Sequence, residues 1–161
     1  MFNSYYPGGT IINLPEPPRI RPVPTHMTLE YYNDPPIIDN PYKNETPYQA
    51  DGKIFRSRFE VIAIEVIKEL GLEYKNEIPI CTPNGTYFMD IVIPVMEKHR
   101  CVGFEFCGRA DDQKYINSQL PKVLSYLNVG LIPNHDVIFV LGGKDWLPDI
   151  DEIKKRNYIW N

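Results

Sequence analysis

Residues 54–71, IFRSRFEVIAIEVIKELG, carry apolar side chains at helical spacing. From Phe55 onward, the apolar positions recur at intervals of four, three and four residues, as far as Val66. This spacing is the stripe of an amphipathic helix that packs one face on a core. Gly71 is a natural C-terminal stop for such a helix, because glycine adopts the left-handed backbone conformation without strain.

Shorter apolar runs after Gly71 predict strands. These runs occupy residues 72–80, 86–94 and 101–108, with a turn signal at 82–85 and a polar connection at 97–100. Residues 111–130 predict a second helix, which Pro121 is expected to kink or split. Residues 136–143 are typical of a buried central strand, and a short closing helix is expected around 149–156. The order αβββαβ predicts an α/β fold, a mixed sheet with helices on its faces.

The first 50 residues follow no such period. They hold 10 of the 16 prolines and six of the 11 tyrosines. Proline fixes φ and lacks an N–H, so neither a long helix nor a central strand is expected there. The aromatic and aliphatic anchors between the prolines favour an extended Pro/Tyr-rich arm over residues 1–53, lying on the chain's own surface or a partner's. The α/β domain then spans residues 54–161. A protein partner is expected to bind residues 1–50, because proline-rich segments dock into grooves at low entropic cost.

Charge and cysteine content narrow the functional classes. The net charge is −4, whereas nucleic-acid binders usually carry a basic excess, so any contact with DNA or RNA must come from a local patch. The three cysteines have no CxxC spacing, which argues against a disulfide framework and a structural zinc site. We therefore expect the cytoplasm or another reducing compartment, without secretion. No apolar run approaches the length of a membrane span, so no membrane association is expected.

Two carboxylates stand within apolar strands. Glu105 lies in GFEFCG (103–108), and alternation places it on one strand face with Cys107. Asp90 lies in the preceding strand, also among apolar neighbours. A buried unpaired carboxylate is costly, and two in adjacent strands repel unless a cation lies between them. Mg²⁺ typically takes one or two carboxylates plus water, so we predict a site for Mg²⁺ (or Mn²⁺) at this pair. Glu60 on the first helix could reach it if that helix packs over the sheet.

These elements and carboxylates together resemble the PD-(D/E)XK, or restriction-endonuclease-like, nuclease superfamily. The matching positions are Glu60 in SRFE, Asp90 in YFMDIVIP, and Glu105 to Cys107 in GFEFCG. The resemblance covers roughly residues 54–142 and is closest in look to the very-short-patch repair endonuclease-like and RAP-type branches. It implies a restriction-endonuclease-like αβββαβ core and a metal-dependent nuclease that hydrolyses phosphodiester bonds in DNA.

The resemblance also assigns roles. Asp90 and Glu105 would bind one or two Mg²⁺ ions, with the Phe106 carbonyl as a further ligand. Glu60 would be a third member of the catalytic set, as a ligand or a base that orients water.

One position departs from the family pattern, because Cys107 stands where the family has its lysine. Lys114, in the first turns of the second helix, is the expected replacement in the catalytic set. Arg109 is the alternative, although its planar guanidinium suits substrate phosphate better, and Gln113 could help to position water or phosphate.

Two other functions remain open. If nothing replaces the lysine, the chain would be a catalytically degenerate nuclease-fold protein, a structural or assembly component that binds its partner through the N-terminal arm. A nucleic-acid-binding module without catalysis is the third hypothesis. The clustered carboxylates favour the nuclease over both.

Overall fold

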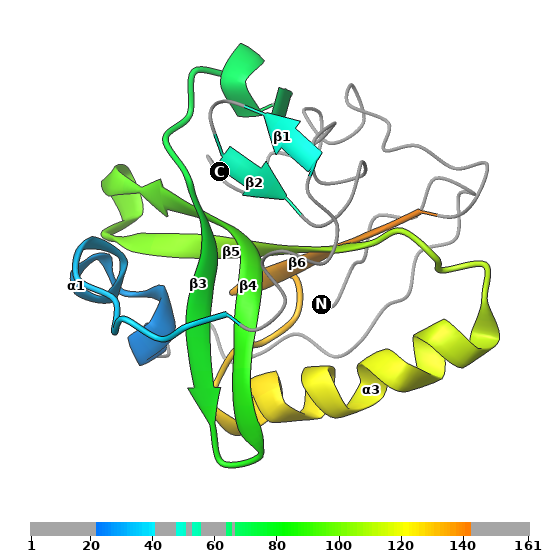
Figure 1. Cartoon of the computed structure of the whole chain (residues 1–161). Coiled ribbons are helices and arrows are strands. Elements are labelled where there is room, and N and C mark those ends of the chain that lie inside the picture. Colours follow the sequence, from blue (N-terminus) through cyan, green and yellow to red (C-terminus); the bar gives the residue numbers. More distant parts are fainter. Residues whose placement is uncertain (1–21, 41–47, 51–52, 56–63, 66, 143–161) are drawn as a thin grey trace.

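A mixed four-stranded sheet organises the protein (Figure 1). The computed structural model describes residues 22–40, 48–50, 53–55, 64–65 and 67–142. The strands of the sheet are β3 (Lys75–Thr82), β4 (Gly85–Val95), β5 (Arg100–Cys107) and β6 (Val137–Leu141), in the order β3-β4-β5-β6. The pairs β3–β4 and β4–β5 are antiparallel, whereas β6 runs parallel to β5. The predicted α/β class is confirmed, with strand ends shifted by one to three residues.

The crossover from β5 to β6 contains helix α3 (Gln113–Asn128), as a parallel strand pair requires a long connection. Asp112 is its N-cap, and the carboxylate accepts hydrogen bonds from the backbone N–H groups of Lys114 and Tyr115 at 2.9 and 3.4 Å. A kink or a split is expected at Pro121, and the split is wrong, because α3 is one helix with Pro121 inside it. Proline removes a single backbone hydrogen bond, and side chains on both sides of it, Tyr115 and Tyr126, pack on the same face of the sheet.

The sheet separates two apolar clusters. In β5, Val102, Phe104 and Phe106 pack on one face, while Cys101 and Cys107 pack on the other. This confirms the predicted alternation of β5. The first face is covered by the helical residues 64–65 and 67–69, and the second by α3 and the N-terminal helices. Both faces of the sheet are therefore buried, as the almost uninterrupted apolar sequence of β6 requires.

The helical residues 64–65 and 67–69 end where the sequence predicts. Gly71 has φ +68°, and its N–H donates to the carbonyl of Lys68 at 3.0 Å. The N–H of Leu72 donates to the carbonyl of Ile67 at 3.2 Å. These two bonds form a Schellman motif, so the stop at Gly71 is confirmed. Glu60 and the closing helix expected around 149–156 lie outside the described residues.

The start of the predicted first helix is wrong. Ile54 and Phe55 lie in strand β2 (Lys53–Phe55), which pairs antiparallel with β1 (Tyr48–Ala50). Ala50 stands opposite Lys53, and the intervening sequence is Asp-Gly, the composition that two-residue hairpins favour. The local turn signal therefore prevails over the helical spacing that begins at Phe55.

Part of the predicted arm folds onto the chain's own sheet. Residues 22–40 contain two short helices, η1 (Thr25–Met27) and α1 (Leu29–Asn33). This part of the predicted arm is therefore not an extended chain. Met27 and Tyr32 are buried in the cluster beneath α3 and these helices. Residues 1–21 and 41–47 of the arm lie outside the described residues. Among the helices that the structure describes, none is both long enough and apolar enough to cross a membrane.

Candidate active site

The site begins where β4 separates from β5. Their pairing runs from Val95 opposite Arg100 to Ile91 opposite Phe104. Farther along β5, the backbone N–H of Phe106 donates to Oδ2 of Asp90 at 2.8 Å. The carboxylate thus replaces the strand neighbour that this buried donor would otherwise need. Asp90 is 4% exposed, so this bond forms inside the molecule.

β4 is irregular at Asp90. Glu77 has φ +58° and drops out of an otherwise continuous β3–β4 register at the position opposite Asp90. On either side of Asp90, Met89 and Val92 pack in the same apolar cluster although they are three residues apart. The strict alternation of a regular strand therefore does not hold along β4. Asp90 occupies the break, and its carboxyl lies within hydrogen-bonding reach of Glu105.

Glu105 is the centre of a buried polar cluster. It is 2% exposed; its Oε1 accepts a hydrogen bond from the hydroxyl of Tyr126, and its Oε2 lies 3.3 Å from Nζ of Lys122. Burial, followed by the charge of Asp90, raises the pKa of Glu105 to about 8, although Lys122 and Tyr126 act in the opposite direction. The carboxyl of Glu105 therefore titrates near neutral pH.

Lys122 supplies the cation of the cluster. It projects from the middle of α3 and its side chain is 22% exposed. Burial lowers the pKa of Lys122, but the charges of Glu105 and Asp90 outweigh burial and leave this pKa raised. Lys122 is therefore an ammonium group at all physiological pH values. Its side chain is partly exposed at the surface, and its ammonium group contacts the buried Glu105.

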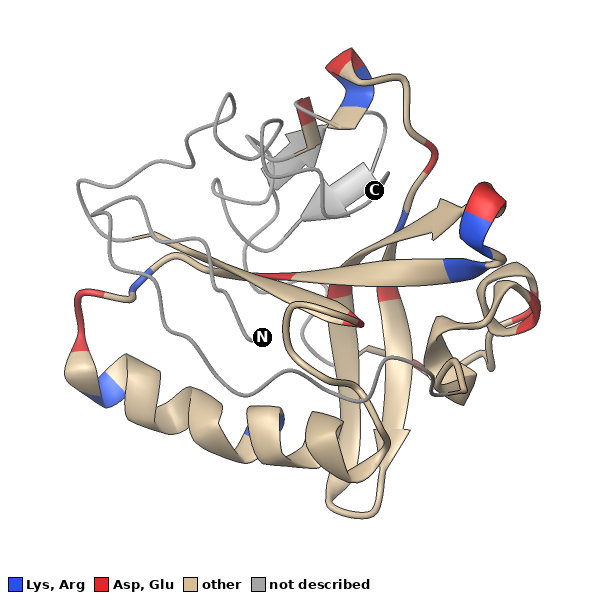
Figure 2. Ribbon diagram, turned by 180° about the vertical axis from the view of Figure 1, so that it is seen from behind, with Lys and Arg blue, Asp and Glu red and all other residues tan. Residues whose placement is uncertain are grey.

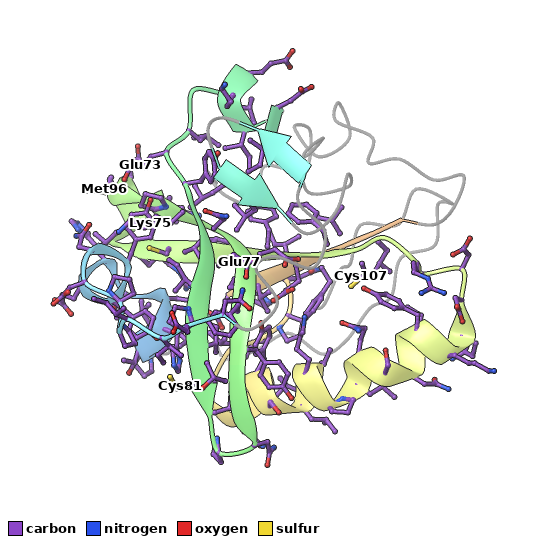
Figure 3. The ribbon with its side chains drawn as sticks, viewed as in Figure 1. Glu73, Lys75, Glu77, Cys81, Met96 and Cys107 are labelled. Carbon is purple, nitrogen blue, oxygen red and sulfur yellow. The ribbon has the colours of Figure 1, made fainter. Side chains whose placement is uncertain are left out.

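Cys107 lies two residues beyond Glu105 and projects from β5 toward α3 (Figure 3). Burial, followed by the charge of Glu105, raises the pKa of its thiol to about 12. The group is therefore a neutral thiol that packs in the apolar cluster with Tyr126. Position 107 therefore carries no charge, and the cation that contacts Glu105 is Lys122 from α3.

The three polar residues predicted beyond β5 lie apart from this cluster. Lys114 is exposed in the first turn of α3, about 12 Å along the helix axis from Lys122. Arg109 is 68% exposed and pairs with Asp112 at 2.7 Å. Gln113 is exposed and donates to Oδ1 of Asn117 at 2.8 Å. The structure thus brings Asp90 and Glu105 together and places these three elsewhere.

Sequence reasoning missed Lys122 and Tyr126. With Tyr115 and Gln119, they follow one stripe of α3 at intervals of four, three and four residues. A lysine within a stripe that faces a sheet is the signal that could have identified the cation. The kink or split expected at Pro121 concealed it, because a helix interrupted there need not keep the residues before and after Pro121 on one face.

A cleft borders this cluster at Lys122. It lies between β4 and α3 and has a volume of about 340 Å³. Its lining residues are Thr86, Tyr87, Phe88, Ser118, Gln119, Pro121 and Lys122. Lys122 therefore contacts Glu105 with its ammonium group and borders the cleft as well.

The oxygen donors present suit a hard divalent cation. Asp90 and Glu105 are adjacent buried carboxylates, and burial, followed by the charge of Asp90, raises the pKa of Glu105. A cation between the two carboxylates would relieve their repulsion. In an extended strand the C=O and N–H of one residue point to the same edge, so the Phe106 carbonyl faces the Asp90 side of β5. The described residues contain no group of three His, Cys, Asp or Glu side chains suited to a metal. Backbone, water and substrate oxygens would complete the shell, as is usual for Mg²⁺.

Comparisons of this chain with protein-family models, with curated proteins and with solved structures gave no match. A functional assignment therefore depends on the geometry of Asp90, Glu105 and Lys122.

Proposed function

We propose that the protein is a metal-dependent nuclease of the PD-(D/E)XK type that hydrolyses phosphodiester bonds in DNA. The order of elements supports a restriction-endonuclease-like core: a helical segment, three antiparallel strands, a crossover helix and a strand parallel to the third. The divergence of β4 from β5 adds to this support, because it opens the sheet beside both carboxylates.

The observation that carries the proposal is the convergence of Asp90, Glu105 and Lys122 at this divergence. Asp90 and Glu105 would hold Mg²⁺ or Mn²⁺, which when bound polarises the scissile phosphate and lowers the pKa of a ligated water. Lys122 holds a fixed positive charge where negative charge develops on the attacked phosphate. Tyr126 donates to Oε1 of Glu105, which orients the carboxylate and favours its ionised form.

Lys122 takes the role that the family gives to the position of Cys107. A neutral thiol at that position is small, so it permits the long side chain from α3 to approach Glu105. The ammonium then reaches the same carboxylate from the helix instead of from the strand. This arrangement supports catalysis without requiring Lys114 or Arg109.

A cleavage assay with two lysine variants tests the proposal. Supercoiled plasmid is incubated with the protein in Mg²⁺, in Mn²⁺ and in chelator, and nicking is followed by gel electrophoresis. We expect metal-dependent nicking that Asp90→Asn abolishes and that Lys122→Met slows by about 10²–10³-fold, the usual effect of losing one group that stabilises the transition state. Lys114→Met, on the same helix but exposed, is the matched control and should retain wild-type activity.

The assay also decides between the hypotheses. Circular dichroism shows whether each variant is folded, so loss of activity is separated from loss of structure. If the folded wild-type protein cleaves neither plasmid nor single-stranded DNA with either metal, the nuclease proposal is wrong. The degenerate nuclease-fold protein that binds a partner through its N-terminal arm would then be the better interpretation.

A further inference from the structure

The cleft between β4 and α3 lies beside the carboxylate pair, and Lys122 belongs to both. Its β4 wall is formed by Thr86, Tyr87 and Phe88, and its α3 wall includes Ser118 and Gln119. Its volume of about 340 Å³ lies at the lower end of the range of small-ligand sites, about 300–1,000 Å³. A cleft of this size accommodates a single small residue of a larger substrate.

The lining chemistry matches the three parts of a nucleotide. Tyr87 is half-buried and provides aromatic surface of the kind on which bases stack, whereas the neighbouring Phe88 is buried. Ser118 and Gln119 provide hydroxyl and amide groups that can bond to base or sugar. Lys122 provides the positive charge for a phosphate, at the end of the cleft where its ammonium meets Glu105.

The acidic net charge of the protein favours a single strand over a duplex as its ligand. Binding of a duplex depends on many contacts between basic side chains and phosphates. The chain has a net charge of −4, and on the described elements lysine and arginine do not gather on one face (Figure 2). Stacking in a cleft needs fewer cations, because every base offers an apolar face whatever its sequence.

We infer that the β4–α3 cleft binds one unpaired nucleotide of a single-stranded segment, with its base against Tyr87 and its phosphate at Lys122. This inference rests on the proposed nuclease function and names its substrate class. The phosphate at Lys122 then lies beside Asp90 and Glu105, so cleavage takes place next to the unpaired nucleotide.

Binding measured in chelator tests the cleft separately from catalysis. The probe is a fluorescent oligodeoxythymidine of about 12 nucleotides, within the usual site size for single strands, compared by fluorescence anisotropy with a duplex of equal length. We expect the single strand to bind about tenfold more tightly than the duplex. Ser118→Trp, which fills the cleft from α3, should weaken single-strand binding by about tenfold, the loss of one stacked base. Asn117→Trp, an exposed neighbour outside the cleft, is the matched control and should bind as wild type does.

The outcomes separate the two proposals. Single-strand binding that Ser118→Trp weakens, in a protein that cleaves nothing, supports the cleft and contradicts the nuclease. Metal-dependent cleavage with equal binding of duplex and single strand supports the nuclease and overturns the cleft. Wild-type binding by Ser118→Trp also overturns it, provided that the variant gives the wild-type circular dichroism spectrum.

Discussion

Glu105 is a buried ionisable group that is surrounded by other polar and ionisable side chains. Its carboxyl faces Asp90 from β4, Lys122 and Tyr126 from α3, and Cys107 from its own strand. Asp90 disfavours its charge, Lys122 and Tyr126 favour it, and burial decides the balance. The folded protein therefore holds the proton of Glu105 far more tightly than an unfolded chain does.

This difference predicts a specific dependence of stability on pH. The pKa of Glu105 is raised from 4.5 to about 8, so its contribution to the free energy of unfolding is complete below pH 4.5 and is lost as the pH rises to about 8. Glu105→Gln cannot titrate, so its free energy of unfolding should not show this decline. Urea unfolding at several pH values between 4.5 and 9 measures the difference.

The control is Glu97→Gln, which replaces an exposed glutamate of the turn η2 (Met96–Lys98). It should follow the pH dependence of the wild-type protein. Parallel curves for wild type and Glu105→Gln across this range would contradict the buried, proton-binding state of Glu105.

At this scale, the sequence permits the prediction of the carboxylate pair but not of its cation. A carboxylate in an apolar strand is a local pattern, and alternation is enough to bring Glu105 toward a neighbour. The position of Lys122 beside Glu105 depends on whether α3 continues through Pro121, and tertiary packing determines that. Glu60 lies outside the described residues, so its role stays a prediction.

Among the elements, β4 and β5 are in close contact at Gly103, where the Met89 side chain leaves no room for a Cβ atom. A Cβ atom at Gly103 would lie 2.9 Å from both Cε and Sδ of Met89, whose side chain is fully buried. A side chain at position 103 therefore requires the Met89 side chain to move.

A double-mutant cycle tests this contact. We expect Gly103→Ala to destabilise the protein by about 1–3 kcal/mol through overpacking, and Met89→Ala by about 2–5 kcal/mol through a cavity. The double variant should be more stable than the sum of the two effects predicts, by about 1 kcal/mol, because the new methyl group occupies space that the methionine leaves. Urea denaturation of the four proteins measures the coupling; additivity within about 0.5 kcal/mol would exclude the contact.

The elements themselves were predictable where the pattern is long. The runs that became β4 and β6 are apolar over most of their length, and Gly71 marks a helix end whose backbone requires glycine. The β1–β2 hairpin was missed because its strands are three residues each, too short for a period to be distinguished from the helical spacing that follows.

In the whole molecule, residues 22–40 belong to the core. Figure 1 shows η1 and α1 beside the sheet, although the strands of the sheet come much later in the sequence. Met27 is fully buried against the face that also holds Tyr126 and Cys107. The sequence predicted that this region lies on a surface, of the chain itself or of a partner. It could not show which side chains are buried, because proline-rich segments have no period that identifies an inward side.

Two substitutions in this region should therefore differ in effect. Met27→Ala should reduce the free energy of unfolding by about 2–5 kcal/mol, because it leaves a cavity in the core. Ile37→Ala removes an equally apolar but fully exposed side chain and should change it by less than about 0.5 kcal/mol. Chemical denaturation gives both values; equal effects would mean that η1 is not packed on the sheet.

The bond from Phe106 N–H to Asp90 has a consequence for how the interior tolerates a break in the sheet. Two strands that separate within a sheet leave backbone groups without their strand neighbour, and a buried group cannot turn to bulk water instead. Asp90 is 4% exposed, and its carboxylate accepts the hydrogen bond that the neighbouring strand would otherwise accept. The separation of β4 from β5 is thus compatible with a buried sheet, because a side chain replaces a strand.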